Sequence, residues 1–510
     1  MRSMSLAALH FMLVTLVVPP GPNAPPAGST PPPASAPVVA TTPDSDPGAA
    51  APTAPVATPE PVTEPVTAPV TEPVAPPPTV TTPPTVTTTP PAGSGPKRAP
   101  AVAPTDSTVF NARQGAESRV ADTSYRIGKG FTMASKDERF SLQIRVRFQF
   151  RYELEHYNTT GEAAKAMAQS VQVRRLRLIL QGNVFSPYVK YRLQFGFSPR
   201  DMQNDLPNEP GSIRRNPLRD IKIEVDRLRD FNFSFGQFKV PFSRQRMLSS
   251  SAMNMVDRSL VNAEFNLDRD IGIMFNSKDV GGLGHRLAYF AGVFMGEGRN
   301  SFDLGNFGMM YVGRLEYLPF GKFEDATEGD IERSKKPGLA IAAAYAYHDR
   351  ARAARGVVGD YPADHGTTDF HHMTSDILFK WRGLSLVTAV HLRKGFNRKN
   401  GGAVDEMNNP IATVAARSGL GWFGQLGYVV PKIPLEVVGR YGLVRNIYGD
   451  SSSILEADEA GAGLNWYFVS HDLKLQLDYH RLWDSTMGLT RAEAASHGTD
   501  RLRVQLALYF

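Results

Sequence analysis

The 510-residue chain contains no cysteine, which excludes a disulfide scaffold, a thiolate metal site, a cysteine nucleophile and a lipid anchor attached through cysteine. It also lacks an apolar run long enough to cross a bilayer as a helix, so a helical membrane protein is excluded. Proline is scarce over most of the chain, because 28 of the 40 prolines lie in the first 104 residues. The chain therefore has two parts of different composition.

The first part has the pattern of an export signal followed by a tether. Arg2 precedes an apolar stretch, roughly Leu6 to Val18, which is too short for a spanning helix and has the plan of a secretory signal peptide. We assign residues 1–25 to this signal. Residues 26–104 form a Pro/Thr/Val-rich repeat that favours extended polyproline II and is predicted to be a disordered tether. A passive spacer is the simpler interpretation, and binding to the cell wall or to a periplasmic protein is the alternative.

After a lead-in over residues 105–139, the hydrophobic periodicity becomes two. Seven apolar residues alternate with seven polar ones from Phe140 to Glu153, which indicates a strand with one apolar face. The pattern recurs from Val189 to Ser198 and from Arg501 to Phe510. The same rule predicts sixteen strands, beginning near residues 140, 171, 188, 220, 231, 268, 286, 309, 338, 370, 383, 418, 434, 458, 471 and 501.

Short and long connections alternate between these strands, with one exception near residues 319–337, where a short join is expected and a long one is found. An even number of strands with short turns at one rim and long loops at the other is typical of a bacterial outer-membrane barrel. A large sandwich or propeller is the alternative. Aromatic residues near the strand ends, such as Tyr191, Trp381 and Trp466, favour the barrel. We therefore expect an all-β fold, a 16-stranded antiparallel transmembrane β-barrel over residues 140–510, with the tether in the periplasm.

If the apolar faces meet lipid, the polar faces line the lumen, and their charge is predicted to be positive. The strand residues predicted to face inward include fifteen basic and eight acidic side chains, which gives the lumen a net charge of about +7. The last strand and the first three form one continuous wall in a closed barrel, and this basic wall holds nine of the bases. They are Arg145, Arg147, Arg151, Arg175, Arg177, Lys190, Arg192, Arg501 and Arg503.

Such a wall is expected to repel cations and admit anions, because a passing ion cannot be fully screened from it. The guanidinium groups can each meet two oxygens of a phosphate or carboxylate. The alternative is that these arginines pair with acids of the loops and hold the loops in place.

The long loop near residues 239–267 is neither purely polar nor periodic, and we expect it to fold into the lumen and set the narrowest point. Lys239, Arg244, Arg246 and Arg258 would then make the constriction basic. These four residues and the nine of the basic wall are the predicted anion-binding residues.

Several segments resemble the phosphate-selective porin O and P family: GQFKVPFS (236–243), DRSLVN (257–262), RDIG (269–272) and the strands within 174–195. The terminal Phe510 is similar to the assembly signal of outer-membrane proteins. The resemblance covers roughly residues 125–510. It implies a sixteen-stranded porin, commonly a homotrimer, in which an arginine ladder leads to a constriction at the inward-folded third loop and binds phosphate or polyphosphate. The Pro/Thr tether departs from the helical N-terminal segment that members often have.

The sequence gives little support to other functions. His371 and His372 are adjacent and would point to opposite faces of a strand, so they cannot share a metal, and no Ser/His/Asp set shares one face. We predict neither an enzyme nor a cofactor nor a metal site. The pI near 9.2 would suit a nucleic-acid partner. However, the predicted signal peptide and the alternation of apolar and polar residues along the strands place the charges inside a channel. Two alternatives stay open: a non-selective or general anion porin, and a plugged barrel that acts as a cell-wall anchor through its Pro-rich tether.

Overall fold

The computed structural model describes residues 120–126, 128–158, 167–202, 216–301, 308–484 and 497–510. All of them belong to one compact unit, and the second unit, Val18–Arg113, lies wholly outside the described residues. The predicted signal peptide and tether therefore lie outside the described part of the chain. No helix among the described residues is long and apolar enough to cross a membrane.

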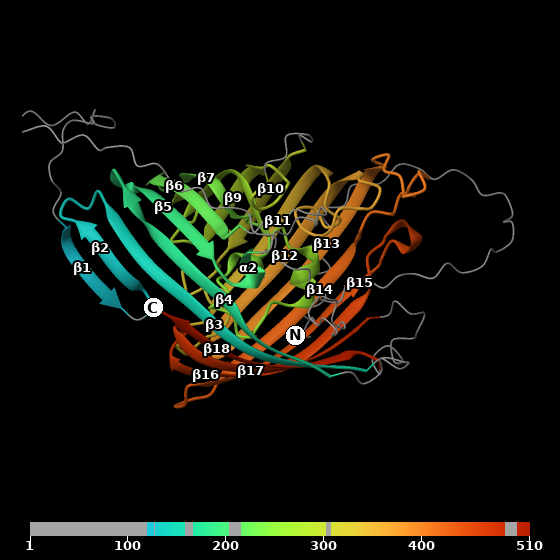
Figure 1. Ribbon diagram of the computed structural model, residues 1–510. Coiled ribbons are helices and arrows are strands. Elements are labelled where there is room, and N and C mark those ends of the chain that lie inside the picture. Colours follow the sequence, from blue (N-terminus) through green and yellow to red (C-terminus); the bar gives the residue numbers. More distant parts are fainter. Residues whose placement is uncertain (1–119, 127, 159–166, 203–215, 302–307, 485–496) are drawn as a thin grey trace, which may run out of the picture. The chain divides into compact units, whose positions relative to one another are not determined.

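The described residues form one continuous antiparallel sheet that closes on itself (Figure 1). A short hairpin comes first, β1 (Val120–Arg126) and β2 (Gly130–Ser135). The barrel strands are β3 (Ser141–Tyr157), β4 (Met167–Val184), β5 (Ser186–Gly196), β6 (Leu218–Leu228), β7 (Phe231–Lys239), β8 (Arg269–Ser277), β9 (Leu287–Phe294), β10 (Met310–Tyr317), β11 (Gly338–Ala351), β12 (Thr367–Trp381), β13 (Leu384–Lys399), β14 (Gly419–Val429), β15 (Leu435–Arg445), β16 (Ala457–Val469), β17 (Leu473–Asp484) and β18 (Thr499–Tyr509). The helices are α2 (Pro199–Met202), α3 (Arg244–Met247) and α4 (Leu260–Phe265), with single 3-10 turns at Val280–Gly282 and Gly449–Ser451.

Pairing of the last barrel strand with the first closes the ring. β18 runs antiparallel to β3, with Leu502 opposite Leu154 and Leu508 opposite Phe148. Sixteen strands, β3 to β18, thus make a closed barrel, and the fold predicted from the alternation is confirmed. Each strand begins within four residues of its predicted position, including the strands near 220, 309 and 370.

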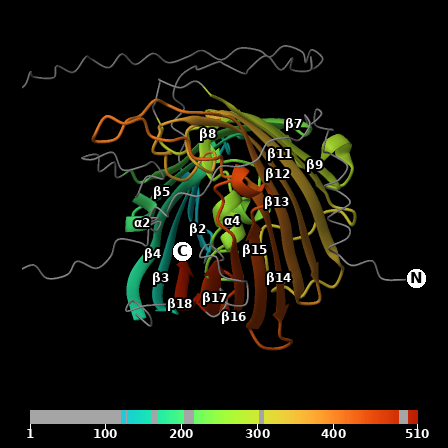
Figure 2. The same cartoon turned by 90° about the vertical axis from the view of Figure 1, so that its right-hand side faces the viewer.

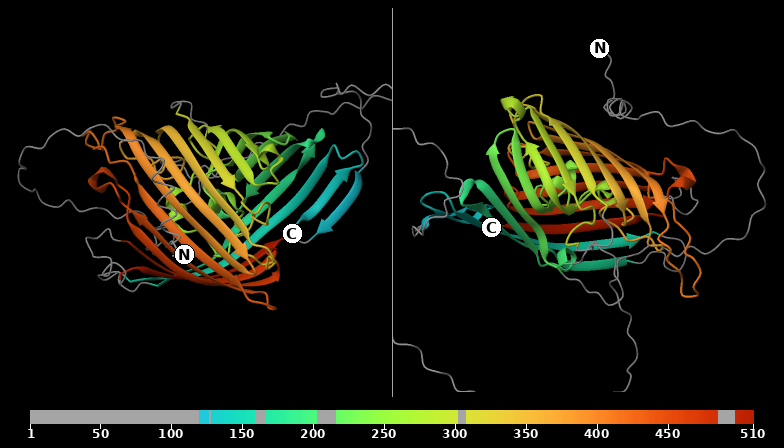
Figure 3. Two further views of the ribbon diagram at one scale, coloured as in Figure 1. Left: turned by 180° about the vertical axis from the view of Figure 1, so that it is seen from behind. Right: turned by 90° about the horizontal axis from the view of Figure 1, so that it is seen from above.

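The β1–β2 hairpin continues the sheet beside the seam, and the alternation did not predict it. β2 pairs with residues 141–144 of β3, and β18 takes over the same edge of β3 from Arg147 onward. Both β2 and β18 must lie on one edge, because β4 occupies the other edge of β3. The hairpin therefore extends the wall where the C-terminal strand ends (Figure 3).

The two faces of the wall differ as the alternation requires. Outward side chains such as Leu315, Leu426 and Leu475 are exposed in the isolated chain, whereas inward neighbours such as Arg314, Gln425 and Lys474 are buried. An unpaired polar group would be costly in lipid, so the closed ladder and the inward polar face are both required in a membrane. The interior of this barrel combines buried, hydrogen-bonded polar residues with two buried apolar clusters.

Candidate channel lumen and constriction

The loop between β7 and β8, residues 240–268, fills much of the barrel interior and is called the inward loop below. It contacts strands from far around the ring. Asn254 Nδ2 donates to Glu436 Oε1 of β15 at 2.9 Å, and the Val256 N–H donates to Asp478 Oδ2 of β17 at 3.0 Å. Only a segment inside the ring can reach these strands and β3 as well, and Figure 2 shows α4 within the ring. The predicted inward-folded third loop is confirmed.

Apolar contacts and one helix cap give the inward loop its local structure. Ser259 caps α4 by accepting a hydrogen bond from the Asn262 N–H at 3.1 Å, which satisfies one of the free amides of the first turn. Val261 and Phe265 of α4 then pack against Phe423 and Leu378 of the barrel wall in one buried cluster. This packing fixes the α4 end of the inward loop against β12 to β15.

A carboxylate of the inward loop meets the basic wall. Asp257 lies 2.6 Å from Arg151, 3.3 Å from Arg174, 3.3 Å from Arg175 and 3.4 Å from Arg503, measured between nitrogen and oxygen. Burial alone would raise the pKa of Asp257, but the charges of these arginines hold it well below its usual range. Asp257 is therefore an anion already bound within the wall.

A β-bulge brings Arg174 into this group. Gln149 pairs with Arg175, but the next residue, Phe150, pairs with Val173, so Arg174 stands opposite no partner. Arg174 and Arg175 are consequently both buried, although strict alternation would place them on opposite faces. The sequence pattern misses Arg174 because the register depends on the partner strand.

Other residues of the basic wall are also paired with acids. Arg177 holds Asp201 of α2 with two bonds of 2.6 Å, and Arg503 also donates to Asp478 at 2.7 and 2.9 Å. Arg501 pairs with Glu153 and Glu155. Lys190, which is half exposed, pairs with Asp226 at the short-turn rim. These ion pairs fit the alternative interpretation, in which the basic residues pair with acids and hold the loops in place.

The four cations predicted at the constriction divide into two pairs. Arg244 is buried and structural, since its Nε lies 2.8 Å from Asp376 of β12, and Arg246 pairs with Asp268 at the end of the loop. Lys239 and Arg258 instead donate to backbone carbonyls. Lys239 Nζ lies 2.8 Å and Arg258 Nη2 2.9 Å from the carbonyl oxygen of Leu248.

Arg147 of the basic wall approaches the same turn of the inward loop. Its guanidinium donates to Ser249 Oγ at 2.7 Å and Ser250 Oγ at 2.9 Å, and lies over the Tyr509 ring. Arg147, Lys239 and Arg258 therefore converge on residues 248–250, and none of the three forms an ion pair with a carboxylate of the described residues. We call these three residues the carboxylate-free cluster.

Charges of both signs surround the carboxylate-free cluster. Desolvation and the charges of Arg246 and Arg175 hold the pKa of Arg258 well below its usual range, against the opposing effect of Asp268 and Glu328. An arginine nevertheless stays protonated at neutral pH. Lys239, Ser249 and Arg258 are half-buried and keep some solvent access, whereas Arg147 and Ser250 are buried. The arrangement offers charged donors and hydroxyls to an anion, with no acid in the cluster to compete for them.

Arg145 and Arg192 also lack a carboxylate partner among the residues described. Arg145 donates to the Gly128 carbonyl oxygen in the β1–β2 turn at 2.6 Å. Arg192 donates to Gln181 Oε1 at 2.7 Å and Gln194 Oε1 at 3.3 Å. Both residues contribute to the charge that acts on Arg147, so they extend the positive region along the basic wall.

The long join at the short-turn rim has a structural explanation. Residues 318–337 turn into the barrel, where the Glu328 N–H donates to the Ala252 carbonyl oxygen at 2.9 Å. The fully buried Glu328 carboxylate accepts from the Asn254 N–H and from Gln425 Nε2, each at 2.9 Å. This join supports the inward loop from the opposite rim, which the sequence pattern did not predict.

The histidines of β12 lie on opposite faces, as predicted: His372 is buried inside, and His371 faces outward beside Tyr345. No group of three or more His, Asp or Glu residues within the described ranges could hold a metal ion.

Comparison with known families supports this architecture. Residues 143–327 match the family model of the phosphate-selective porins O and P. The resemblance inferred from the motifs is confirmed over that region, which holds β3 to β10, the inward loop and most of the basic wall. No curated protein matches the chain.

Solved porin structures also match the chain, at low sequence identity. The anion-selective porin from Comamonas acidovorans is 14% identical, covers 72% of this chain and 100% of its own, and has a TM-score of 0.46. The outer membrane channel DcaP of Acinetobacter baumannii is 12% identical over 74% of this chain and 99% of its own, with a TM-score of 0.42. Salmonella typhi OmpF is 12% identical over 76% and 100%, with a TM-score of 0.45. The match of residues 143–327 to the phosphate-selective porin model supports an outer-membrane channel.

Proposed function

We propose that the barrel is a passive outer-membrane channel for small anions, with inorganic phosphate or polyphosphate as its preferred class. The carboxylate-free cluster carries the proposal. Arg147, Lys239 and Arg258 meet at residues 248–250 with only carbonyl and hydroxyl oxygens as partners. Several moderate sites of this kind let an anion enter and also leave.

The thirteen predicted anion-binding residues then have different roles. The paired ones hold Asp257, Asp201 and other acids and keep the inward loop in position. The carboxylate-free cluster, with Arg145 and Arg192 beside it, contacts the passing anion. Phosphate is favoured over chloride because it has several oxygens to accept hydrogen bonds from Arg147, Arg258 and the serine hydroxyls at once.

A plugged barrel is the second candidate, and one observation favours it. The inward loop is tied to β12, β15, β16 and β17, and residues 318–337 support it from the other rim. In that case the barrel would act as a cell-wall anchor through its tether, and the bound loop would block ion flow.

Single-channel recording in planar bilayers separates these functions. The purified full chain is expected to give discrete steps that carry mainly anions in potassium chloride, and added phosphate should lower the chloride current. Absence of steps would support the plug. Current that phosphate leaves unchanged would reduce the function to a general anion porin. A homotrimer, and contact of the tether with the cell wall, stay predictions.

A further inference from the structure

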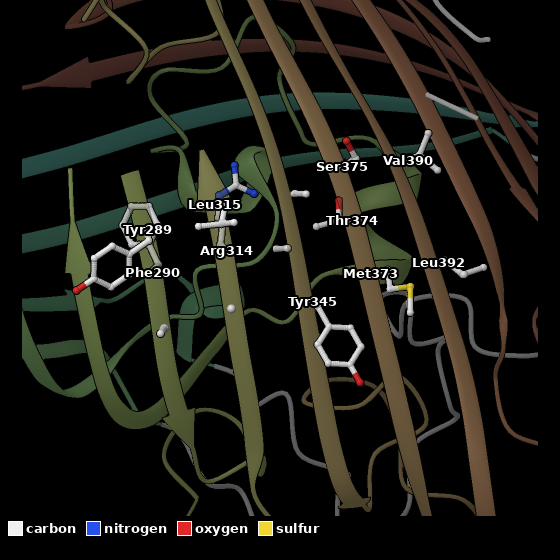
Figure 4. A pocket seen from close by; sticks show the side chains of 14 residues that line it. Tyr289, Phe290, Arg314, Leu315, Tyr345, Met373, Thr374, Ser375, Val390 and Leu392 are labelled. Atoms are coloured by element: carbon white, nitrogen blue, oxygen red, sulfur yellow. The ribbon is translucent and has the colours of Figure 1, made fainter. Parts of the chain in front are cut away.

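The outward surface of β9 to β13 carries an apolar groove with a volume of about 550 Å³ (Figure 4). Gly313, Ala343 and Ser375 supply its small residues, and Tyr345, Met373 and Leu392 border one end. These positions face outward, because the intervening Arg314 and Ala344 are buried inside the barrel. The groove is also open at its floor, since nothing lies within 4 Å of the place where a Cβ of Gly313 would stand. It therefore faces the hydrocarbon of the membrane.

A polar row borders this groove on the same outward face. Tyr347 pairs with His371, and His371 pairs with Lys394, so the three side chains stand at one level on β11, β12 and β13. His371 and Lys394 are two residues from Met373 and Leu392 along their strands, and residues two apart share a face. The polar row and the groove are thus continuous.

The polar row presents hydrogen-bond donors and a positive charge. Tyr345 Oη lies 2.6 Å from His371 Nδ1, and when this hydroxyl donates, Nε2 carries the ring proton and is a donor. Lys394 Nζ lies 5.0 Å from the ring centres of Phe396 and Tyr448, and it forms no ion pair with any carboxylate that the structure describes. The nearby Asp369 is engaged by the Arg350 N–H and Asn397 Nδ2, each at 2.8 Å.

The position of the polar row indicates the level of the bilayer that it meets. It lies toward the long-loop ends of β12 and β13, whereas the groove runs from it toward mid-strand. In outer-membrane barrels the long loops face the cell exterior. A cation and aromatic hydroxyls at this level suit the headgroups of the outer leaflet.

We propose that this face binds a phosphate-bearing lipid of the outer leaflet, with one acyl chain in the groove and the phosphate on Lys394 and His371. Charge complementarity favours this occupant over a second copy of the chain, because Lys394 lies at the headgroup level without an ion-pair partner among the described residues, and a lipid phosphate supplies an anion there. The proposal depends on the barrel lying in the outer membrane and is independent of anion conduction.

Native mass spectrometry of the purified full chain tests the proposal, with lipid A and an uncharged diacylglycerol as probes. Lys394→Ala should weaken lipid A binding about fivefold and leave diacylglycerol binding unchanged, because only the charge is removed. Gly313→Leu should weaken the binding of both probes at least about tenfold, because the side chain fills the groove.

Matched variants serve as controls. Gly439→Leu places the same side chain at an outward glycine of β15 that is equally open, and Lys335→Ala removes an exposed cation at the other rim. Both controls should bind lipid like the wild type. Equal binding by all variants would overturn the proposal, and so would equal loss in Gly439→Leu and Gly313→Leu. A change of oligomeric mass in Gly313→Leu without a change of lipid binding would assign the face to a second copy instead.

Discussion

At the scale of single residues, Asp257 determines what the basic wall can do. Four arginines surround its carboxylate, so their positive charges are largely neutralised by ion pairs that hold the inward loop. Arg147, Lys239 and Arg258 are left with neutral oxygens alone. Ion pairing with the loop acid therefore accounts for these four arginines, whereas anion contact is proposed for the carboxylate-free cluster.

Replacing Asp257 with Asn should have two opposite effects. The free energy of unfolding is expected to fall by about 3 kcal/mol, because removing one partner of a buried ion pair leaves charge uncompensated. The folded fraction should become more anion selective, since the lumen loses a negative charge. Urea unfolding from lipid vesicles and reversal potentials measure the two effects. Asp450→Asn, at an exposed site, is the control and should change neither.

The stability that Asp257 contributes should be lost when the pH falls. Its pKa in the folded protein is held well below the usual value, whereas in the unfolded chain it is about 3.9. A lowered pKa contributes stability that is present above about pH 4 and lost as the pH falls through the folded value. The difference between wild type and Asp257→Asn should therefore be constant from pH 8 to pH 5 and shrink below about pH 4. A difference that grew on acidification would contradict this role.

At the scale of elements, the strands were predictable and their tertiary partners were not. Alternation is local, so the segment from Phe140 to Glu153 indicates β3 without knowledge of its neighbours. The bulge at Arg174 depends on the partner strand, and the contact of Asp257 with the wall depends on a loop path that no local rule specifies. The β1–β2 hairpin has weak alternation and gains its order from pairing with β3.

Packing of α4 against the barrel wall should control the position of the inward loop. Phe265 is buried beside Val261, Phe423 and Leu378. Phe265→Ala should cost about 3 to 5 kcal/mol of folding free energy by leaving a cavity, and the loosened loop should increase the noise of single-channel current. Phe468→Ala, at an exposed outward site, should leave the current unchanged. An unaltered current in Phe265→Ala would indicate that α4 does not hold the loop.

At the scale of the whole molecule, the ring closes through the pairing of β3 with β18. β3 and β18 pair from Arg147 to Tyr157, whereas β2 meets only residues 141–144. The barrel and the inward loop were predicted from the sequence and the family resemblance, and the match over residues 143–327 supports the latter. The roles assigned to the signal peptide and tether stay predictions.

A chain that carries the signal peptide but lacks residues 26–135 should therefore still form a closed barrel. We expect the folded, heat-modifiable species on electrophoresis and the wild-type conductance, with slightly lower thermal stability because β3 loses the β2 ladder. A second deletion, of residues 26–104 alone, keeps β1 and β2 and should match the wild type in stability. Failure of both chains to fold would assign an assembly role to the tether.

The reversal potential in a potassium chloride gradient tests the central claim most directly, by comparing wild type with Arg147→Gln/Lys239→Gln/Arg258→Gln. We predict an anion-selective wild type and a fall in the anion-to-cation permeability ratio of at least about fivefold in the triple variant, because one charge ~4 Å from an ion contributes about 1 kcal/mol even in a water-like dielectric. The control Lys335→Gln/Lys336→Gln/Lys432→Gln removes three exposed cations at the short-turn rim and should keep the wild-type ratio. A cation-selective wild type, or a triple variant with the wild-type ratio, would contradict the account.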